Sequence, residues 1–435
     1  MKSSKYNIIV RNGDAYILYN SLRDRMMVCA LETFKLLESH RENPNALSGI
    51  HPELYRCLTD RKFLVPDETD ETDELIASIE KSETSDTHFS ITINPTMDCN
   101  LACWYCYEDH LHDSRMPIEV LNGIRNMLRN ICDNGKTRSL SLGFFGGEPL
   151  LEFKSRVVPI ILEARTLCGE KQIVLNLDFT SNAVLLTRDK ADFLHDTGLP
   201  VRFQIPFDGG REMHDTVKKM KNGRPTYDLT LDNLKYAVEQ GIRVTVRCNY
   251  TNQSAVSFHG LLDDLLPFFE KHKDSMTFSL HQVWQDERNC EETNDAVRSL
   301  EKRINAIVHA DPSGVLNDVR CYADRRNAFV VNYNGDLYQC TARKFAPEDR
   351  EGVLHEDGTI EHNERYRTRM ASRFSNPECM ECAIYPICKT CTQKRLEREQ
   401  GHCLWSAEKE QYIEDVVRSR IAELYRLAAV RTAKS

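Results

Sequence analysis

The sequence lacks three features that would assign it to a large protein class at once. It has no apolar run near the roughly 18 residues that a membrane-spanning helix needs. Its first residues lack the long apolar core of a secretory signal. It has no excess of positive charge, since 57 Lys and Arg stand against 66 Asp and Glu, for a net charge of -9. These absences predict a cytoplasmic protein that binds neither membranes nor nucleic acid.

Cysteine, by contrast, is abundant, with 16 in 435 residues. Because the cytosol keeps thiols reduced, metal binding or catalysis explains them better than a disulfide framework does. Three lie within residues 99–106 and seven more within residues 321–403. We expect the other six to be small buried hydrophobic side chains. These six are Cys29, Cys57, Cys132, Cys168, Cys248 and Cys290.

Strand and helix patterns alternate six times between residues 88 and 310. Strict β-α alternation with short turns predicts an α/β fold, a parallel sheet wrapped by helices in a partial (β/α)6 TIM barrel. We expect this barrel at 87–315. A winged-helix-like module with a linker would precede it at 1–86. A Cys-rich domain at 316–410 and a C-terminal helix at 411–435 would follow.

Cys99, Cys103 and Cys106 form a CxxxCxxC spacing directly after the first predicted barrel strand. Three thiolates on one loop can bind three irons of a [4Fe–4S] cluster and leave the fourth iron open. A structural zinc, the alternative, favours CxxC pairs and four ligands. The spacing, with Tyr105 before the third cysteine, resembles the radical SAM superfamily signature. The resemblance implies that S-adenosylmethionine (SAM) chelates the open iron and is split by one electron to give a 5′-deoxyadenosyl radical.

Short polar or glycine-containing motifs end the later barrel strands, where barrel enzymes keep their active sites. GGEP at 146–149 resembles the family motif that contacts the SAM amino group, and TSN at 180–182 resembles its polar turn. QIPFDG at 204–209 resembles the family's Q-I-x-x-D-G sequence. For each residue alone, a satisfied loop side chain is the alternative. The residues implied to bind SAM are Tyr105, Gly146, Gly147, Glu148, Ser181, Asn182, Gln204 and Arg247, and the catalytic candidate is Asp208.

The cysteines of residues 321–403 resemble the SPASM domain of radical SAM maturases, which carries two auxiliary [4Fe–4S] clusters. The region is turn-rich and poor in apolar core, so we expect metal ligation to supply its order. The resemblance implies one cluster on Cys379, Cys382, Cys388 and Cys403. It implies a second cluster on Cys321, Cys340 and Cys391. Two structural zincs are the alternative.

Two features depart from the SPASM pattern. Only two residues separate Cys388 from Cys391, where the family usually has three, which puts the role of Cys391 in doubt. The set with Cys321 and Cys340 has three evident ligands. Cys290, a group other than cysteine, or an iron left open for substrate would complete it.

The hairpin-plus-helices order of residues 1–86 is similar to the leader-peptide recognition element of enzymes that modify ribosomally made peptides. Such modules bind a peptide as an added edge strand. A domain that only caps the barrel is the alternative.

Together the resemblances imply a radical SAM peptide maturase, a RiPP-modifying oxidoreductase. It would abstract a hydrogen from a ribosomal precursor peptide with its leader and form a thioether or C–C crosslink. A flavodoxin- or ferredoxin-type donor would supply electrons, and the auxiliary clusters would carry electrons away. The first alternative is an anaerobic sulfatase-maturing enzyme that forms formylglycine. The second is a non-catalytic peptide-binding iron–sulfur protein.

Overall fold

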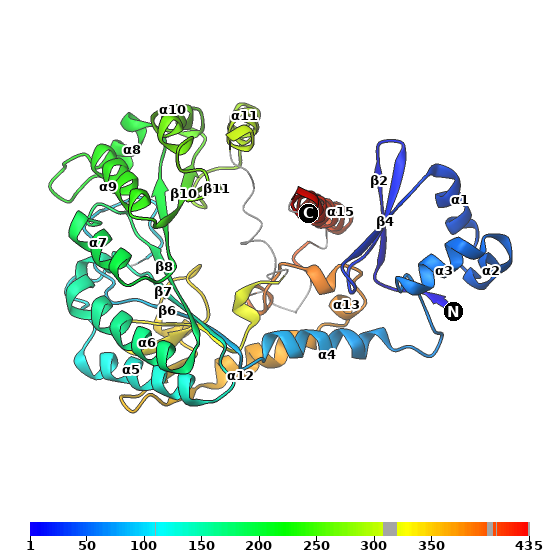
Figure 1. Ribbon diagram of the computed structural model, residues 1–435, viewed down its shortest axis with the longest axis horizontal. Helices are drawn as coiled ribbons and strands as arrows, with labels where there is room; N and C mark the ends of the chain where they lie inside the picture. The colour runs from blue at the N-terminus through cyan, green and yellow to red at the C-terminus, as the bar shows by residue number, and fades with distance from the viewer. Residues whose placement is uncertain (109, 308–319, 398–402, 406, 434–435) are drawn as a thin grey trace. The chain divides into compact units, whose positions relative to one another are not determined.

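The computed structural model describes residues 1–108, 110–307, 320–397, 403–405 and 407–433. The chain divides into two compact units (Figure 1). Unit 1 contains Met1–Ser85, Pro312–Arg326 and Arg367–Ser435, and unit 2 contains Asp86–Asp311 and Asn327–Tyr366. Residues 327–366 of the predicted Cys-rich domain thus group with the barrel strands, and its other residues group with the N-terminal module. None of the helices in the described ranges is long and apolar enough to cross a membrane.

Unit 2 is built on one sheet in which six consecutive strands are parallel and run in the order β11-β10-β9-β8-β7-β6. This confirms the predicted α/β sheet of six β-α units. The strands are β6 (His88–Ile93), β7 (Ser139–Phe144), β8 (Val174–Thr180), β9 (Val201–Phe207), β10 (Arg243–Tyr250) and β11 (Met276–Gln282). The helices are α5 (Ile118–Asp133), α6 (Val158–Lys171), α7 (Arg188–Asp196), α8 (Arg211–Val217), α9 (Tyr227–Glu239), α10 (Phe258–Phe269) and α11 (Glu291–Ile307).

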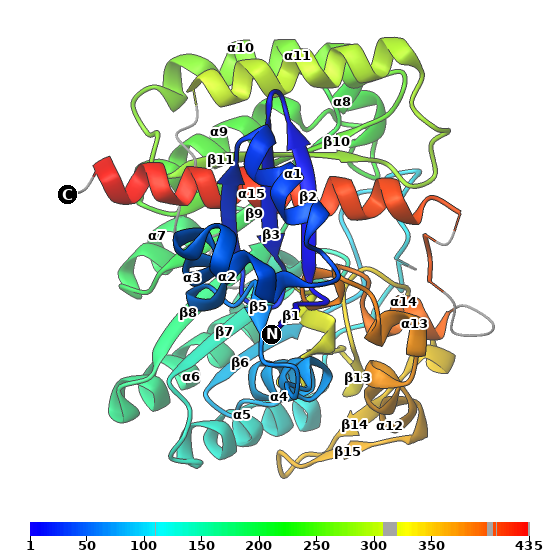
Figure 2. The ribbon, with the colours of Figure 1, turned by 90° about the vertical axis from the view of Figure 1, so that its right-hand side faces the viewer.

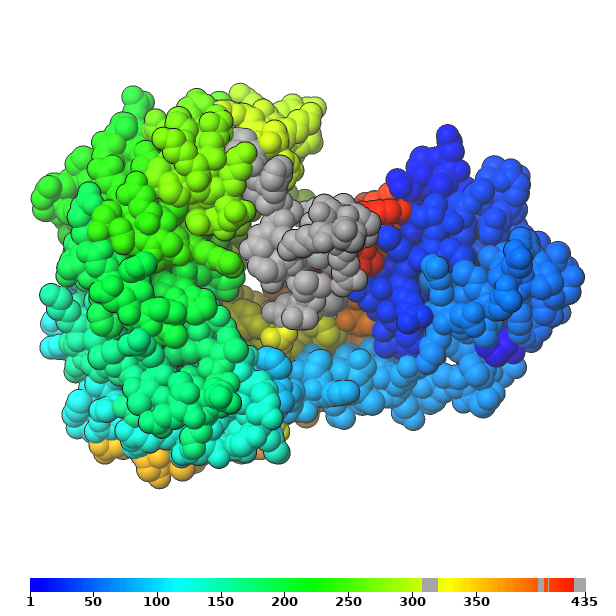
Figure 3. All heavy atoms as spheres, in the orientation of Figure 1, coloured from blue at the N-terminus to red at the C-terminus, as the bar shows by residue number. Residues whose placement is uncertain are grey.

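The apolar residues of each strand alternate, which is why one face of this sheet is covered by helices. In β7 and β10 every second side chain is buried, as expected for a strand packed on one side. Helix α5 presents Leu121, Ile124 and Leu128, spaced three and four residues apart, to the same core. Figure 3 shows the covering helices as a continuous band of side chains, coloured from cyan to green. Parallel strands then place all their carboxyl ends at one edge.

The sheet of unit 2 continues past the six predicted strands. Strand β12 (Ala328–Val331) lies parallel to β6, followed by antiparallel β13 (Asp336–Tyr338), β14 (Gly352–Leu354) and β15 (Ile360–His362). The backbone at Gly358 packs closely on α5, since a Cβ there would lie 2.4 Å from the Met127 nitrogen. Strand pairing and packing on α5 therefore contribute to the order of this segment, which the sequence did not predict.

Unit 1 begins with an antiparallel sheet of β2 (Asn7–Asn12), β3 (Ala15–Asn20) and β4 (Arg25–Cys29). The predicted hairpin turns at Gly13 with φ +61°, and β4 is a third strand that the pattern did not reveal. Helices α1 (Leu31–Ser39), α2 (Leu47–Ile50) and α3 (Pro52–Asp60) follow (Figure 2). The two-residue strands β1 (Lys2–Ser3) and β5 (Leu64–Val65) pair with each other.

The predicted linker is largely a helix, α4 (Glu71–Glu83), whose first turn is capped by the Asp70 carboxylate. Its Leu75 and Ile79 are buried with Tyr6 and Tyr385, so α4 packs within unit 1. The Cys-rich part of unit 1 consists of short elements and one long helix. These are η5 (Tyr322–Asp324), α12 (Glu364–Ala371, of which 367–371 lie in unit 1), η7 (Ser372–Phe374), α13 (Pro377–Met380), η8 (Tyr385–Ile387), α14 (Thr392–Leu396) and α15 (Lys409–Ala433).

Candidate cluster and cofactor site

The loop after β6 carries the three cysteines of the CxxxCxxC motif. Cys99 is buried, Cys103 is half-buried and Cys106 is exposed. Asp98 orients the start of the loop by accepting a hydrogen bond from the Cys99 nitrogen at 2.8 Å. Burial raises the pKa of Cys99 to about 12, with Glu148 adding to the rise, and burial raises the pKa of Cys106 to about 11. Such thiols become thiolates at neutral pH only beside a strong positive partner such as iron, so they suit a cluster better than a free nucleophile.

Each of the three sulfur atoms has its own polar neighbour. Asn182 Nδ2 lies 3.8 Å from the Cys99 sulfur, and Lys218 Nζ lies 3.8 Å from the Cys103 sulfur. The Cys106 sulfur is 3.3 Å from His110 Nε2. In the described part of the chain, no three His, Cys, Asp or Glu side chains converge on the position of one metal ion. A cubane cluster has a different requirement, one thiolate for each of the irons that the protein ligates.

The glycines of the GGEP motif pack against the backbone of this cysteine loop. A Cβ at Gly146, which has φ +99°, would lie 2.4 Å from the Thr96 carbonyl oxygen. A Cβ at Gly147 would lie 2.2 Å from the Asp98 carbonyl oxygen. Both residues must therefore be glycine for the end of β7 to approach the loop after β6. We predicted backbone contact with SAM here, and the observed reason for the glycines is this close approach of two loops.

Glu148 joins the ends of β7 and β8 and is fully buried. Its carboxylate accepts hydrogen bonds from the Leu150 nitrogen at 3.0 Å, Ser181 Oγ at 2.8 Å and the Asn182 nitrogen at 2.9 Å. Asn182 in turn donates to Asn100 Oδ1 at 2.9 Å, which ties the end of β8 to the cysteine loop. The structure thus brings Glu148, Ser181 and Asn182 together as supports of the loop.

Tyr105 lies at the centre of a second polar cluster. Its hydroxyl donates to Asp208 Oδ1 at 2.5 Å and accepts from Lys218 Nζ at 2.9 Å and Asn249 Nδ2 at 3.1 Å. The Lys218 ammonium also lies 3.1 Å from Asp208 Oδ2, with both side chains almost fully buried. Burial opposes the charge on Lys218, but Asp208 and the neighbouring Cys103 and Tyr105 hold its pKa well above the usual value. Asp208, the predicted catalytic residue, is thus ion-paired in this structure and positions Tyr105.

Gln204 and Arg247 lie on the adjacent strands β9 and β10 of the same edge. The backbone oxygen of Gln204 accepts from the Ser181 nitrogen at 3.2 Å. Arg247 Nε donates to Asn249 Oδ1 at 2.8 Å, which links it to the Tyr105 cluster. The predicted residues from β6 to β10 therefore meet at one end of the sheet.

Sequence reasoning missed two buried residues at this site. Lys218 follows the short helix α8, in a stretch where neither periodicity nor spacing marked a functional residue. Glu108 lies two residues after Cys106. It is 7% exposed, and neither of its carboxylate oxygens has a hydrogen-bond partner in the described ranges. Burial raises its pKa to about 8. A carboxylate so close to a cysteine motif was the signal that could have marked it.

Residues 93–265 match the family model described as the radical SAM superfamily. This chain carries a radical SAM domain. The match begins at the end of β6 and includes Cys99, Cys103 and Cys106, together with the strand-end residues described above. The family uses SAM and a [4Fe–4S] cluster, and the raised pKa values of the Cys99 and Cys106 thiols fit such a cluster.

Known proteins resemble the chain beyond the radical SAM domain. The cysteine-type anaerobic sulfatase-maturating enzyme of Clostridium perfringens is 23% identical over 352 residues, or 72% of this chain and 91% of that protein. The structure of native anSMEcpe with bound AdoMet and Kp18Cys peptide superposes with a TM-score of 0.56 at 17% identity, covering 78% of this chain and 99% of that one. Streptococcus suis SuiB bound to S-adenosylmethionine gives a TM-score of 0.51 at 16% identity, covering 92% of this chain and 98% of SuiB. Both structures show the fold that this chain shares.

Outside the radical SAM domain, the structure gathers one of the predicted auxiliary sets. Cys379, Cys382, Cys388 and Cys403 line a single cavity in unit 1, together with Tyr385 and Tyr412. Cys321 and Cys391, also in unit 1, lie near enough to each other for each thiol to shift the pKa of the other. Cys340 is buried in unit 2 after β13. Cys290, in unit 2, is exposed with its sulfur 3.1 Å from Thr293 Oγ1.

Proposed function

We propose that this protein is a radical SAM peptide maturase that forms a thioether or C–C crosslink in a ribosomal precursor peptide. The observation that carries the proposal is the combination of a radical SAM domain with an N-terminal module that has a groove beside an unpaired strand edge. The groove is the feature that points to a peptide as substrate.

The groove lies in the N-terminal module and has a volume of about 410 Å³. It runs along β2, which pairs with β3 on one side and with no other described strand. Its wall is apolar at Ile9, Leu37 and Phe63 and basic at His40 and Arg41. An extended leader peptide would pair with the free edge of β2 and place apolar side chains in the groove. The superposition with SuiB covers 92% of this chain, whereas that with anSMEcpe covers 78%. The larger coverage supports the view that the N-terminal module belongs to the fold shared with SuiB.

At the barrel edge, we propose that Cys99, Cys103 and Cys106 hold the SAM-binding cluster. When bound, the cluster and SAM supply a 5′-deoxyadenosyl radical that abstracts a hydrogen atom from the substrate. Glu148 and Asn182 keep the cysteine loop in place through their hydrogen bonds. The Lys218 ammonium balances the charge of Asp208 and of the nearby Cys103 thiolate.

In unit 1, we propose that Cys379, Cys382, Cys388 and Cys403 hold an auxiliary [4Fe–4S] cluster that accepts an electron after hydrogen abstraction. Cys321, Cys340 and Cys391 would hold another. A flavodoxin- or ferredoxin-type protein would deliver the electron that starts the reaction. If all three clusters are present, the Cys388→Ala variant should lower the iron content from about twelve to about eight per chain.

Formylglycine formation is the second candidate, because the chain spans 91% of the sulfatase-maturating relative. That relative is matched over 72% of this chain. A maturase of this type would oxidise a single Cys or Ser of its substrate to an aldehyde. The two candidates therefore differ in product, and mass spectrometry separates them.

The test uses the anaerobically reconstituted full chain, SAM, a reductant and the precursor peptide encoded beside the gene. A crosslink should appear as the loss of two hydrogens in a product that hydrazine does not derivatise. An aldehyde product would favour formylglycine. An unchanged mass with deuterium uptake from solvent would mean epimerisation and contradict the crosslink.

A matched pair of variants tests the groove. Ile9 on β2 and Val28 on β4 are both exposed apolar residues of the N-terminal sheet, at 37% and 56%. Ile9→Glu should weaken binding of a fluorescent leader peptide at least tenfold, because it places a charge in the groove, whereas Val28→Glu should not. Equal effects of the two variants would contradict the groove assignment.

A further inference from the structure

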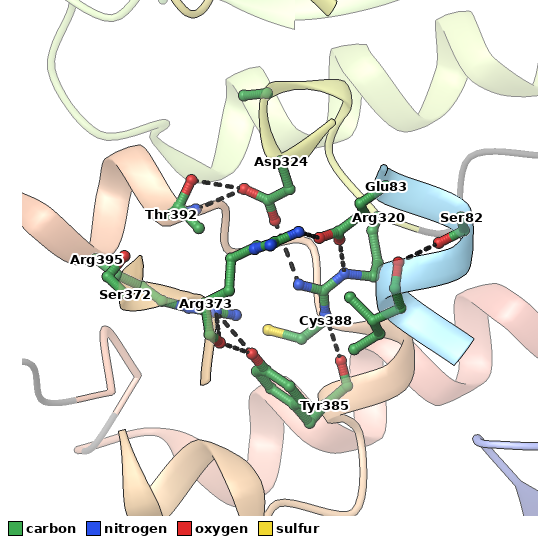
Figure 4. Close-up of polar contacts among 12 residues, drawn as sticks. Ser82, Glu83, Arg320, Asp324, Ser372, Arg373, Tyr385, Cys388, Thr392 and Arg395 are labelled. Atoms are coloured by element: carbon green, nitrogen blue, oxygen red, sulfur yellow. Dashed lines mark hydrogen bonds and ion pairs between the residues drawn. The ribbon is translucent and has the colours of Figure 1, made fainter. Parts of the chain in front are cut away.

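Arginines gather beside the four-cysteine cavity of unit 1. Figure 4 shows Arg320, Arg373 and Arg395 with Cys388 and Tyr385, and the three guanidinium groups are largely buried. A buried guanidinium remains charged at any physiological pH. Each of these charges therefore needs either a carboxylate partner or another negative group nearby.

Two of the three arginines have carboxylate partners. Glu83 at the end of α4 lies 2.8 Å from Arg320 Nε and 3.3 Å from Arg373 Nη1. Arg320 Nη2 also lies 3.3 Å from Asp324. The positive charges of Arg320 and Arg373 are thus balanced by two acidic side chains.

Arg395 on α14 has no such partner. It is 9% exposed, and no ion pair joins it to another described residue. Its Nη1 donates to the Tyr385 hydroxyl at 3.1 Å and to the Arg373 carbonyl at 3.5 Å, both uncharged acceptors. Its Nη2 is buried and has no hydrogen-bond partner in the described ranges. Among the described residues, no carboxylate lies at ion-pair distance from Arg395, and Asp324 acts on its charge only from farther away.

The neighbouring cavity gains negative charge once a cluster is bound, and Lys409 is among its lining residues. Tyr385 forms part of the cavity wall, and the Arg395 guanidinium lies 4.9 Å from the centre of the Tyr385 ring. Burial opposes the charge on Arg395, but Tyr385, Cys379, Cys388 and Asp324 hold the pKa of its guanidinium above the usual value. Four thiolates around a [4Fe–4S] cluster make a net anion, and one-electron reduction makes it more negative.

We propose that Arg395 raises the reduction potential of the auxiliary cluster on Cys379, Cys382, Cys388 and Cys403 by supplying this site with a buried positive charge that no ion pair neutralises. The inference rests on the proposed function, which places the cluster there. The charge stabilises the reduced cluster more than the oxidised one, because the reduced cluster carries one more electron. Arg395 thereby raises the potential and makes the cluster a better acceptor for the one electron that the peptide radical gives up, together with a proton, when the crosslink forms. It is a positioning residue and touches no substrate.

The test is an EPR-monitored redox titration of the reconstituted full chain with Cys99, Cys103 and Cys106 replaced by alanine, so that the SAM-binding cluster is absent. The EPR signal of the cluster in question is identified as the one that disappears when Cys388→Ala is added to this triple variant. Arg395→Gln, which keeps hydrogen-bond donors and removes the charge, should reduce the equilibrium constant for cluster reduction at least tenfold, a downward shift of about 59 mV or more. Arg395→Lys should stay within half of that shift. Arg25→Met, an exposed arginine on β4, is the matched control and should have no effect.

The outcomes separate the inference from the proposal beneath it. If no signal depends on Cys388, the assignment of the cluster fails. If the signal is present and its potential is unchanged in Arg395→Gln, the inference fails and the cluster assignment stands. If Arg395→Gln assembles no cluster, the Arg395→Lys variant decides the question. A reduction potential equal to that of the wild type supports the role of the charge. A shift of about 59 mV or more in Arg395→Lys contradicts that role.

Discussion

The two cysteine sites of this protein differ in what holds their side chains. The loop of residues 99–106 in unit 2 is braced by backbone contacts of two glycines and by the buried Glu148, next to a large apolar core. The four-cysteine cavity in unit 1 is lined by residues of the short helices α13 and η8 and of the start of α15, with buried arginines and carboxylates nearby. One site is preorganised by packing. The other depends on balanced charge and, we propose, on its cluster.

The largest expected difference between the sites concerns SAM cleavage. Cys103→Ala should abolish formation of 5′-deoxyadenosine, because the SAM-binding cluster loses one of its three protein ligands. Cys388→Ala should leave cleavage detectable while it stops peptide modification. Both products are measured by liquid chromatography and mass spectrometry. Loss of cleavage in both variants to the same extent would remove the functional distinction between the sites.

Substitutions in the polar cluster around Tyr105 should change the stability of unit 2 strongly. Lys218→Met leaves the buried Asp208 carboxylate without its ion-pair partner and should cost about 3–5 kcal/mol in the free energy of unfolding of unit 2. Adding Asp208→Asn should recover most of this loss, since no buried charge then remains. Denaturant titration of the single and double variants measures both values. Additive losses would mean that the two residues do not act as a pair.

The stability of unit 2 should depend on pH through His214, and the effect should be of intermediate size. His214 is fully buried, and burial, with a smaller contribution from Lys218, lowers its pKa from 6.5 to about 3. The unfolded chain therefore takes up this proton as the pH falls below 6.5, and the folded chain does so only near pH 3. Stability should thus drop by about 2 kcal/mol between pH 7 and pH 5. His214→Phe should remove this part of the pH dependence, whereas His195→Phe, at an exposed position, should retain it.

Iron removal should lower the stability of unit 1 more than that of unit 2, and this effect should be smaller than the preceding ones. Stripping iron with a chelator under anaerobic conditions should lower the melting temperature of unit 1 by about 2–4 °C or more, equivalent to about 1 kcal/mol. Unit 2 should change less, because its cysteine loop is held by packing. Hydrogen exchange read by peptide reports the two units separately. Greater loss of protection around residues 99–106 than around 379–388 would reverse the comparison.

The predictable part of the fold was the part governed by regular periodicity. Strands β9 and β10 belong to the predicted series of six β-α units, because alternating apolar residues on a sheet covered by helices leave a clear pattern. Strands β13, β14 and β15 have three residues each, too few for any alternation to show. Their place in the same sheet, beyond β12, follows from long-range pairing that no local pattern encodes.

At the site, the spacing of residues in the sequence identified the side chains that iron and SAM require. It did not identify the buried residues that hold those side chains in place. The cysteines stand out because three thiols within eight residues are rare and chemically specific. The role of Lys218 depends on where α8 ends relative to Tyr105 and Asp208, more than 100 residues away from Tyr105 in the chain. The same holds for Arg395, whose isolation becomes visible only when its neighbours' ion pairs are known.

The most direct test of the central claim is to follow hydrogen from the peptide. The reconstituted full chain is incubated anaerobically with SAM, a reductant and the precursor peptide carrying deuterium on its side chains and Cα positions. The account predicts that deuterium appears in 5′-deoxyadenosine and that the peptide becomes crosslinked. Formation of 5′-deoxyadenosine free of deuterium, with the peptide unchanged, would contradict it.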